Sequence, residues 1–399
     1  MINKMPYLAL FFLILVSKGV GQFQFSVSTN QSYESNPFRF VNDEASWIAD
    51  YNFNLQYDFD LFLISYQGGY SSFAQFSDRN FYQQQFAGFK RSDSYEMGFY
   101  FQNRINNQSY SFYDYATSSI YFNKRFNPEY LVVFINADAA YNNYNELQDL
   151  NHFLLSGLIK LQKSFETRST IIAGLSLKYK YYLNTLATEQ ESASIQYSIL
   201  GNGYGQGGPG MRGRQYPGMG YSDSLGVFIS QIPALSVGQL NWYVRLAQSV
   251  FDVTGFAVQY SQSILTDGNN RDLAGLTYNY ADESQFFDDP MGYEQKTFGV
   301  EVTQILPAII QLKAGYYYTH KDYAVQNRYV DDVTLDEQQL RSDDRNIMWL
   351  ALLKRFNFHI LGGQFLTASL DFQKLINKSN SYFYNYKNTS LNFGLTLEF

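Results

Sequence analysis

Apolar and polar residues alternate along most of this chain, one position at a time. The segments YNFNLQY (51–57), AGLSLKYKY (173–181) and TFGVEVT (297–303) each carry an apolar or aromatic residue at every second position. Successive side chains of a β-strand point to opposite faces, so each segment predicts a strand with one apolar face. Helical periodicity is almost absent, and the sequence therefore predicts an all-β protein.

The connections between these segments are of two kinds, which alternate along the chain. Short ones include YDFDLF (57–62), KSFETRST (163–170) and QILPAII (304–310). Long polar ones span residues 32–46, 184–222, 282–294, 321–343 and 375–387. An up-and-down order with these alternating connections requires about 18 strands, two of them at 223–231 and 271–281. Most of the predicted strands are close to the roughly 9–11 residues that a tilted strand needs to cross a bilayer.

This pattern predicts a transmembrane antiparallel up-and-down β-barrel of about 18 strands, within a range of about 14 to 18. The short turns are expected on the periplasmic side and the long loops outside the cell. A secreted β-sandwich or propeller is the alternative fold. The exposed faces of such folds are usually charged, whereas the apolar faces here form a continuous band of Leu, Val, Phe and Tyr. In lipid, only closure of the sheet satisfies the backbone groups of so many strands.

The first 21 residues predict a signal peptide. Lys4 supplies a positive charge, residues 7–16 form an apolar core, and Gly19 and Gly21 precede a cleavage site between Gly21 and Gln22. This core is too short to span a bilayer well, which disfavours the alternative of a retained anchor. Residues 22–399 are expected to form one barrel, with a glycine-rich loop at 201–220.

The composition agrees better with a membrane barrel than with a soluble enzyme. Tyr (36) and Phe (35) are abundant, the mean hydropathy is −0.30, and only 16% of the residues are charged. Because the chain has no cysteine, disulfides, cysteine-based zinc sites and thiol nucleophiles are excluded. A net charge of −7 without a basic block argues against nucleic acid as a partner. No motif indicates a cofactor or a metal site.

The C-terminal segment SLNFGLTLEF (390–399) alternates up to its last residue. It resembles the closing strand of Gram-negative outer-membrane β-barrel proteins of the porin-like class, without indicating a single family. The resemblance implies a location in the bacterial outer membrane, contact with its lipids and lipopolysaccharide, and recognition of this strand by the barrel-assembly machinery. The strand is expected to pair with residues 23–31 and to turn five side chains toward lipid: Leu391, Phe393, Leu395, Leu397 and Phe399.

The polar face of each predicted strand supplies the candidate lumen-lining residues. Both signs of charge occur among them, which does not support strong selectivity for cations or anions. Two interpretations stay open: these residues solvate the lumen and pair across it, or they form a specific binding site. The charged candidates are Glu96, Asp138, Lys178, Lys180, Arg245, Glu301, Lys313 and Asp371.

The glycine-rich segment GNGYGQGGPGMRGRQYPGMG (201–220) lacks the GK[ST] ending of a phosphate-binding loop, so nucleotide binding is not indicated. Its glycines supply conformational freedom. It is expected to be a mobile extracellular loop, and the alternative is a loop folded into the lumen as a constriction that carries Arg212 and Arg214.

An outer-membrane lipid hydrolase would need a serine beside a histidine. The histidines are His152, His320 and His359. His152 and Ser156 share a strand face but lie four residues apart, about 13 Å at the rise of a strand, which is too far for direct contact. The sequence therefore predicts that the protein is not an enzyme, and a hydrolase is kept only as a minor hypothesis.

Two functions remain for such a barrel. The first is a channel that passes small polar solutes or exports a surface polymer. The second is a barrel plugged by its loops, which acts as a structural or accessory part of a secretion or surface-assembly machine with export or secretion partners. Conduction across a bilayer distinguishes the two.

Overall fold

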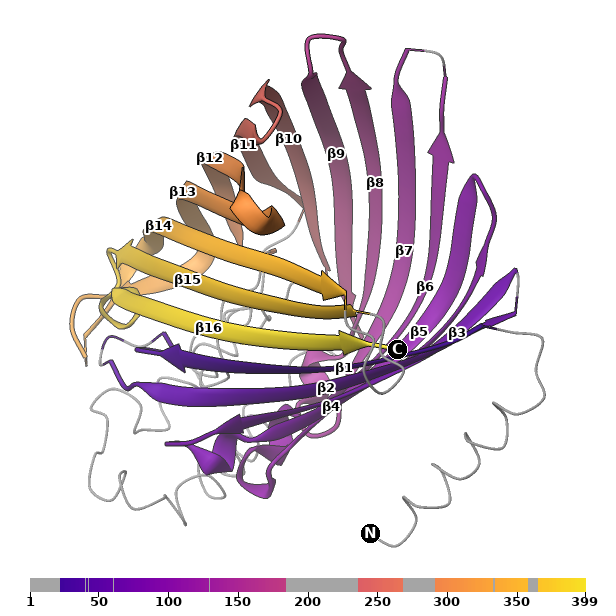
Figure 1. Cartoon of the computed structure of the whole chain (residues 1–399). Coiled ribbons are helices and arrows are strands. Elements are labelled where there is room, and N and C mark those ends of the chain that lie inside the picture. Colours follow the sequence, from indigo (N-terminus) through magenta and orange to yellow (C-terminus); the bar gives the residue numbers. More distant parts are fainter. Residues whose placement is uncertain are drawn as a thin grey trace, which may run out of the picture.

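The computed structural model describes residues 22–183, 236–267, 291–357 and 365–399, apart from the single positions 40, 42, 60, 129 and 333. Over these ranges the chain forms one antiparallel sheet that closes on itself as a barrel (Figure 1). Across the same ranges, none of the helices is both long and apolar enough to span a membrane. The helices that do occur are short 3-10 turns, such as η3 (Gln108–Tyr113) and η7 (Tyr382–Tyr384).

Sixteen strands make up the barrel. In the first half of the chain they are β1 (Gln22–Glu34), β2 (Ser46–Phe59), β3 (Phe62–Phe73), β4 (Phe81–Arg91), β5 (Tyr95–Asn106), β6 (Tyr115–Phe126), β7 (Val132–Tyr144), β8 (His152–Ser164) and β9 (Ser169–Tyr182). In the second half they are β10 (Ser236–Phe251), β11 (Thr254–Asp267), β12 (Tyr293–Leu306), β13 (Ile310–Tyr329), β14 (Leu335–Asn357), β15 (Phe365–Ser379) and β16 (Tyr386–Glu398).

Each strand pairs with its neighbours in the sequence, and β1 pairs with β16 to close the sheet. This seam runs from Ser26, opposite Glu398, to Glu34, opposite Ser390. Figure 1 shows the indigo N-terminal strands lying directly beside the yellow C-terminal strand. No edge is left in the sheet, so backbone N–H and C=O groups of the strands have partners within the barrel. The predicted up-and-down barrel is therefore confirmed.

The number of strands is sixteen, which lies within the predicted range but is two fewer than the count of about 18. The two additional predicted strands, 223–231 and 271–281, lie outside the described residues. The ladder leaves no place for them, because β9 pairs directly with β10 and β11 pairs directly with β12. Alternation alone marks candidate strands but does not count the strands of a barrel, so the sequence pattern set the number only within a range.

The connections confirm the predicted asymmetry between the two ends of the barrel. At one end, together with the beginning of β1 and the end of β16, the strands are joined by residues 60–61, 92–94, 127–131, 165–168, 252–253, 307–309 and 358–364. At the other end they are joined by residues 35–45, 74–80, 107–114, 145–151, 183–235, 268–292, 330–334 and 380–385. We call these the short-turn end and the long-loop end.

One predicted long loop is largely strand. Residues 321–343 were expected to be a polar connection, but β13 and β14 continue through most of this range and leave only residues 330–334 between them. The two strands extend past the long-loop end of β12, whose first residue, Tyr293, pairs with Tyr323. A strand outside the membrane needs no apolar face, so the alternation that identifies membrane strands is lost there.

The outer surface of the barrel carries the apolar band that the alternation predicts. On β16, Leu391 and Phe393 are each 45% exposed, and Leu395, Leu397 and Phe399 follow at the same alternate positions. Phe399 itself contacts the ring of Phe25 across the seam, at 5.6 Å between centroids. Large apolar side chains that stay exposed on strand after strand are what a lipid-facing surface requires.

Candidate functional site

The inner face of the barrel is formed by the positions that alternate with the exposed apolar ones. Arg245 lies between the outward Val244 and Leu246, and Glu301 lies between the outward Val300 and Val302. The same alternation places all eight charged candidates on the inner face: Glu96, Asp138, Lys178, Lys180, Arg245, Glu301, Lys313 and Asp371. Whether they line a conducting path stays a prediction.

A polar cluster near the middle of the wall joins β10, β12 and β13. Arg245 forms an ion pair with Glu301, although β11 separates their strands. Side chains two strands apart converge only on the concave face of a curved sheet, which agrees with their inward direction. Glu301 also accepts a hydrogen bond from the hydroxyl of Tyr317. The charges of this cluster are therefore neutralised within the wall.

Aromatic rings on the inner face lie over glycines of the adjacent strand. A Cβ atom at Gly299 would lie 2.2 Å from Cε1 of Tyr317, and one at Gly174 would lie 2.2 Å from Cε1 of Tyr243. Glycine gives the ring room to lie flat along the wall instead of projecting into the lumen. Gly299 thus leaves room for the Tyr317 ring in the orientation that directs its hydroxyl toward Glu301.

The inward charges are sorted by strand. On β8 to β14 most of the described inward charges are cations, and Glu301 and Asp343 are the anions among them; the cations are Lys160, Lys178, Lys180, Arg245, Lys313, Lys321, Arg341, Arg345 and Arg355. On β15, β16 and β1 to β7, the inward charges that the structure describes are seven anions and three arginines: Asp371, Glu398, Glu34, Asp50, Asp58, Glu96, Asp138, Arg91, Arg104 and Arg125. Both signs occur, as the sequence predicts, but the structure separates a basic wall from a mainly acidic one.

The two ends of the inner face differ in packing. Near the long-loop end, inward side chains are buried on nearly every strand, among them Ile48, Phe73, Phe81, Tyr144, Tyr182, Val237, Tyr293, Tyr323, Leu375 and Tyr386. Toward the short-turn end, the inward side chain of Arg355 is 51% exposed and lies 2.7 Å from Glu398. The inward side chains of the described residues are therefore more buried near the loops than near the short turns.

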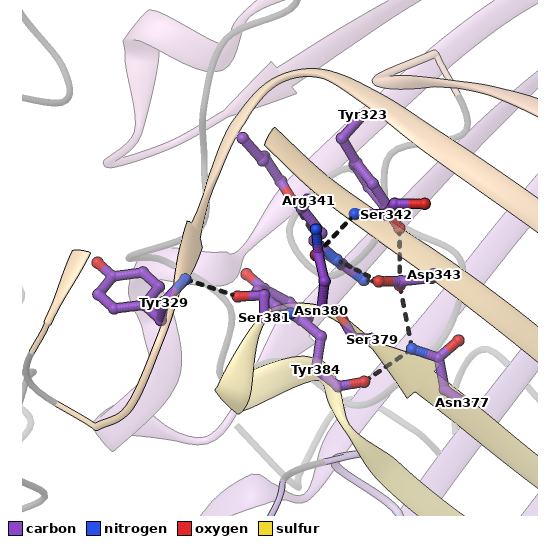
Figure 2. A network of polar contacts seen from close by, with 11 residues as sticks. Tyr323, Tyr329, Arg341, Ser342, Asp343, Asn377, Ser379, Asn380, Ser381 and Tyr384 are labelled. Carbon is purple, nitrogen blue, oxygen red and sulfur yellow. Dashed lines mark hydrogen bonds and ion pairs between the residues drawn. The ribbon is translucent and has the colours of Figure 1, made fainter. Parts of the chain in front are cut away.

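A buried ion pair anchors the long-loop end (Figure 2). Arg341 and Asp343 are both only 1% exposed, and Arg341 Nε lies 3.0 Å from Asp343 Oδ1. The guanidinium lies between the rings of Tyr323 and Tyr384, at 3.9 and 3.4 Å from their centroids. Asn377 donates to both Asp343 Oδ2 and the carbonyl of Tyr384, at 3.0 and 2.7 Å.

This cluster ties the extended β13–β14 hairpin to the turn before β16. Tyr329, at the end of β13, donates its backbone N–H to Ser381 Oγ at 3.0 Å, as Figure 2 shows. The sequence pattern does not single out Arg341, because residues 321–343 are polar enough to predict a loop. The signal that could have found it is the alternation of Arg341, Asp343 and Arg345, which continues the inward positions of β14.

The remaining predicted features lie outside the described residues. They are the signal peptide at 1–21, the glycine-rich loop at 201–220 with Arg212 and Arg214, and His359. The structure therefore does not place the candidate constriction.

The described histidines take part in polar contacts at the ends of strands. His152 is buried, with Nδ1 2.7 Å from the carbonyl oxygen of Leu150 and Nε2 3.1 Å from Asn142. Ser156 is four residues further along the same strand, about 13 Å away. Within the described ranges, no three side chains of His, Asp or Glu group closely enough to hold a metal ion. The geometry adds no support to the hydrolase hypothesis.

Comparison with solved structures identifies the fold. No family model matches the chain, and no curated protein matches its sequence. Pseudomonas aeruginosa OccK1 (OpdK) aligns over 95% of this chain and 99% of its own, with a TM-score of 0.51 and 8% identity. A second structure of the outer membrane protein OpdK from the same organism gives a TM-score of 0.50 with the same identity and coverage.

The chain thus has the fold of a Gram-negative outer-membrane porin, a closed antiparallel barrel of sixteen strands. Pseudomonas aeruginosa OccK8 (OprE) also aligns, over 95% of this chain and 98% of its own, with a TM-score of 0.47 and 9% identity. At these identities the likeness concerns the fold, and the function has to be argued from the lumen.

Proposed function

We propose that this chain is a channel of the bacterial outer membrane that passes small polar solutes. The observation that carries the proposal is the inner face itself. It holds charged, amide and hydroxyl side chains at alternate positions of all sixteen strands, behind an apolar outer band. An interior of this kind is stable when it contacts water, because buried charges without water would cost several kcal/mol each.

The packing of the lumen favours small solutes over a surface polymer. A polymer needs a continuous wide path, whereas the inner side chains near the long-loop end are buried. The proposed environment includes outer-membrane lipids and lipopolysaccharide around the apolar band. We also propose that the barrel-assembly machinery recognises β16 during insertion.

The experiment is conductance across a planar lipid bilayer after insertion of the purified, folded protein. Stepwise current increases in simple salt are the expected result. Glu301→Gln, which leaves Arg245 without its anion, is expected to shift the reversal potential in a salt gradient toward anion preference. Lys163→Gln alters a side chain on the outer face and is expected to leave the potential unchanged. A folded barrel that never conducts would overturn the proposal.

The packed end also supports a second candidate, a plugged accessory barrel of a secretion or surface-assembly machine. Its support is the buried Arg341–Asp343 cluster, which ties two loop-end elements together. Absence of conductance together with stable co-purifying proteins of the cell envelope would favour this candidate over the channel.

A further inference from the structure

A cavity of about 350 Å³ lies on the basic part of the inner wall and is lined by side chains from β9 to β14. Its lining follows the strand register. Lys178 lies opposite Gln239, Ser263 lies opposite Gln295, and Thr319 lies opposite Arg345. The cavity therefore extends around the wall, with a lysine on its first strand and an arginine on its last.

The polar groups of this cavity are held in place by one another. Thr297 and Thr319 join their hydroxyls at 2.9 Å, and Gln295 Nε2 donates to Ser263 Oγ at 3.3 Å. Gln239 donates its amide to the backbone carbonyl of Tyr293 at 3.2 Å. Amides and hydroxyls that are already ordered lose little conformational freedom when they bind a solute.

The ionised side chains of the described lining are all cations. Lys178 and Arg345 are its ionised side chains, and its described lining includes no carboxylate. The nearby Glu301 is paired with Arg245 and lies outside the lining. A second inner-wall cavity of about 420 Å³ has the opposite character, because Glu34, Asp50 and Asp371 line it without a lysine or an arginine. An anion is therefore attracted to the first cavity and repelled by the second.

We propose that the cavity on β9 to β14 binds a small polyhydroxylated anion, such as a sugar that carries a carboxylate or a phosphate. This proposal rests on the proposed channel function, since the solute reaches the cavity through the lumen. The amides, hydroxyls and tyrosines between the two cations can exchange hydrogen bonds with sugar hydroxyls, while Lys178 and Arg345 attract the charged group. The volume equals that of roughly a dozen water molecules, which is enough for one monosaccharide acid.

The experiment measures binding by calorimetry on the full barrel in detergent, and separately measures block of single-channel current. Glucuronate and glucose 6-phosphate are the test solutes, with glucose and acetate as references. We expect at least one sugar anion to bind at least tenfold more tightly than either reference. The stronger of the two indicates whether the carboxylate or the phosphate is the preferred group.

Matched variants test the assignment of residues. Lys178→Gln, at a half-buried position, is expected to weaken binding of the preferred sugar anion at least fivefold, and Arg345→Gln is expected to do the same. Lys163→Gln removes one positive charge from the outer face and is expected to leave the affinity unchanged. If Arg345→Gln does not fold, Lys178→Gln decides the test on its own.

The outcomes separate this inference from the channel itself. A barrel that conducts but binds none of the solutes overturns the site and leaves the channel intact. Equal binding of glucose overturns the need for charge, and equal binding of acetate overturns the need for hydroxyls. Binding that persists unchanged in Lys178→Gln overturns the location. A barrel that binds the sugar anion without conducting overturns the channel and keeps the site.

Discussion

Replacing Arg341 by methionine removes the cation of the most deeply buried ion pair among the described residues and keeps an unbranched, flexible side chain. Asp343 then retains Asn377 Nδ2 at 3.0 Å and the Tyr323 hydroxyl at 3.4 Å, but no positive charge among these contacts. Removing one partner of a buried pair costs about 3–5 kcal/mol, because the other charge stays buried. The free energy lost with the cation–π contacts to the rings of Tyr323 and Tyr384 is taken as part of this cost and is not added to it. We expect Arg341→Met to lower the free energy of unfolding by about 4 kcal/mol.

The assay is denaturant unfolding of the protein refolded in lipid vesicles, followed by intrinsic fluorescence. Arg91→Met is the matched control, because Arg91 is 63% exposed and its pair with Glu96 should contribute at most about 1 kcal/mol. The double variant Arg341→Met with Asp343→Leu should recover most of the loss, since no charge is left buried. If Arg341→Met loses no more stability than Arg91→Met, the buried pair does not anchor the long-loop end.

Three further predictions concern single positions. Gly299→Ala should cost about 1–3 kcal/mol because its Cβ would clash with the Tyr317 ring, whereas Gly157→Ala, whose Cβ would lie 3.9 Å from the carbonyl oxygen of Asn136, should fold with wild-type stability; equal unfolding midpoints would refute this. Ile309 has a φ of 58°, so Ile309→Gly should raise the unfolding free energy by roughly 0.5–1 kcal/mol, and a lower value would contradict the strain. The pKa of Asp336 is lowered from 3.8, first by a backbone N–H two residues further on and then by an arginine side chain. The hairpin contacts that Asp336 makes should persist above pH 3.8 and be lost as the pH falls through its lowered pKa. Protection factors of the hairpin's backbone amides that stay constant down to about pH 2 would argue against this.

The alternation of residues predicts most of the fold, because one physical rule acts on every strand. Each strand that crosses the bilayer must show lipid an apolar side chain at every second position, and β9 follows this rule from Ile171 to Tyr181 and β12 from Phe298 to Val302. The inward direction of Lys178 and Glu301 follows from the same rule. Outside the membrane a strand no longer needs an apolar side chain at every second position. The sequence pattern therefore predicts a loop where β13 and β14 continue beyond the bilayer.

The candidate site was less predictable, because it depends on partners in other strands. The sequence places Arg245 and Glu301 on polar faces, but only the barrel register brings them together across β11. The sorting of charges into a basic and a mainly acidic wall depends on strand order around the barrel in the same way. The cavity between Lys178 and Arg345 joins residues from six strands, and no local pattern marks it.

The seam between β1 and β16 has a consequence for the order of the chain. Phe399 donates its backbone N–H to the carbonyl of Phe25 at 2.8 Å, so the first and last strands of the barrel meet in the wall. The barrel is equivalent to a ring of sixteen strands with one break, and the position of that break is not fixed by the hydrogen bonds of the sheet. A circular permutant of residues 22–399 that joins Phe399 to Gln22 by a short linker and opens at another turn should close to the same barrel. Because β1 and β16 are far apart in sequence, their pairing requires closure of a very long loop. In the permutant the linker makes the pairing of β1 with β16 local.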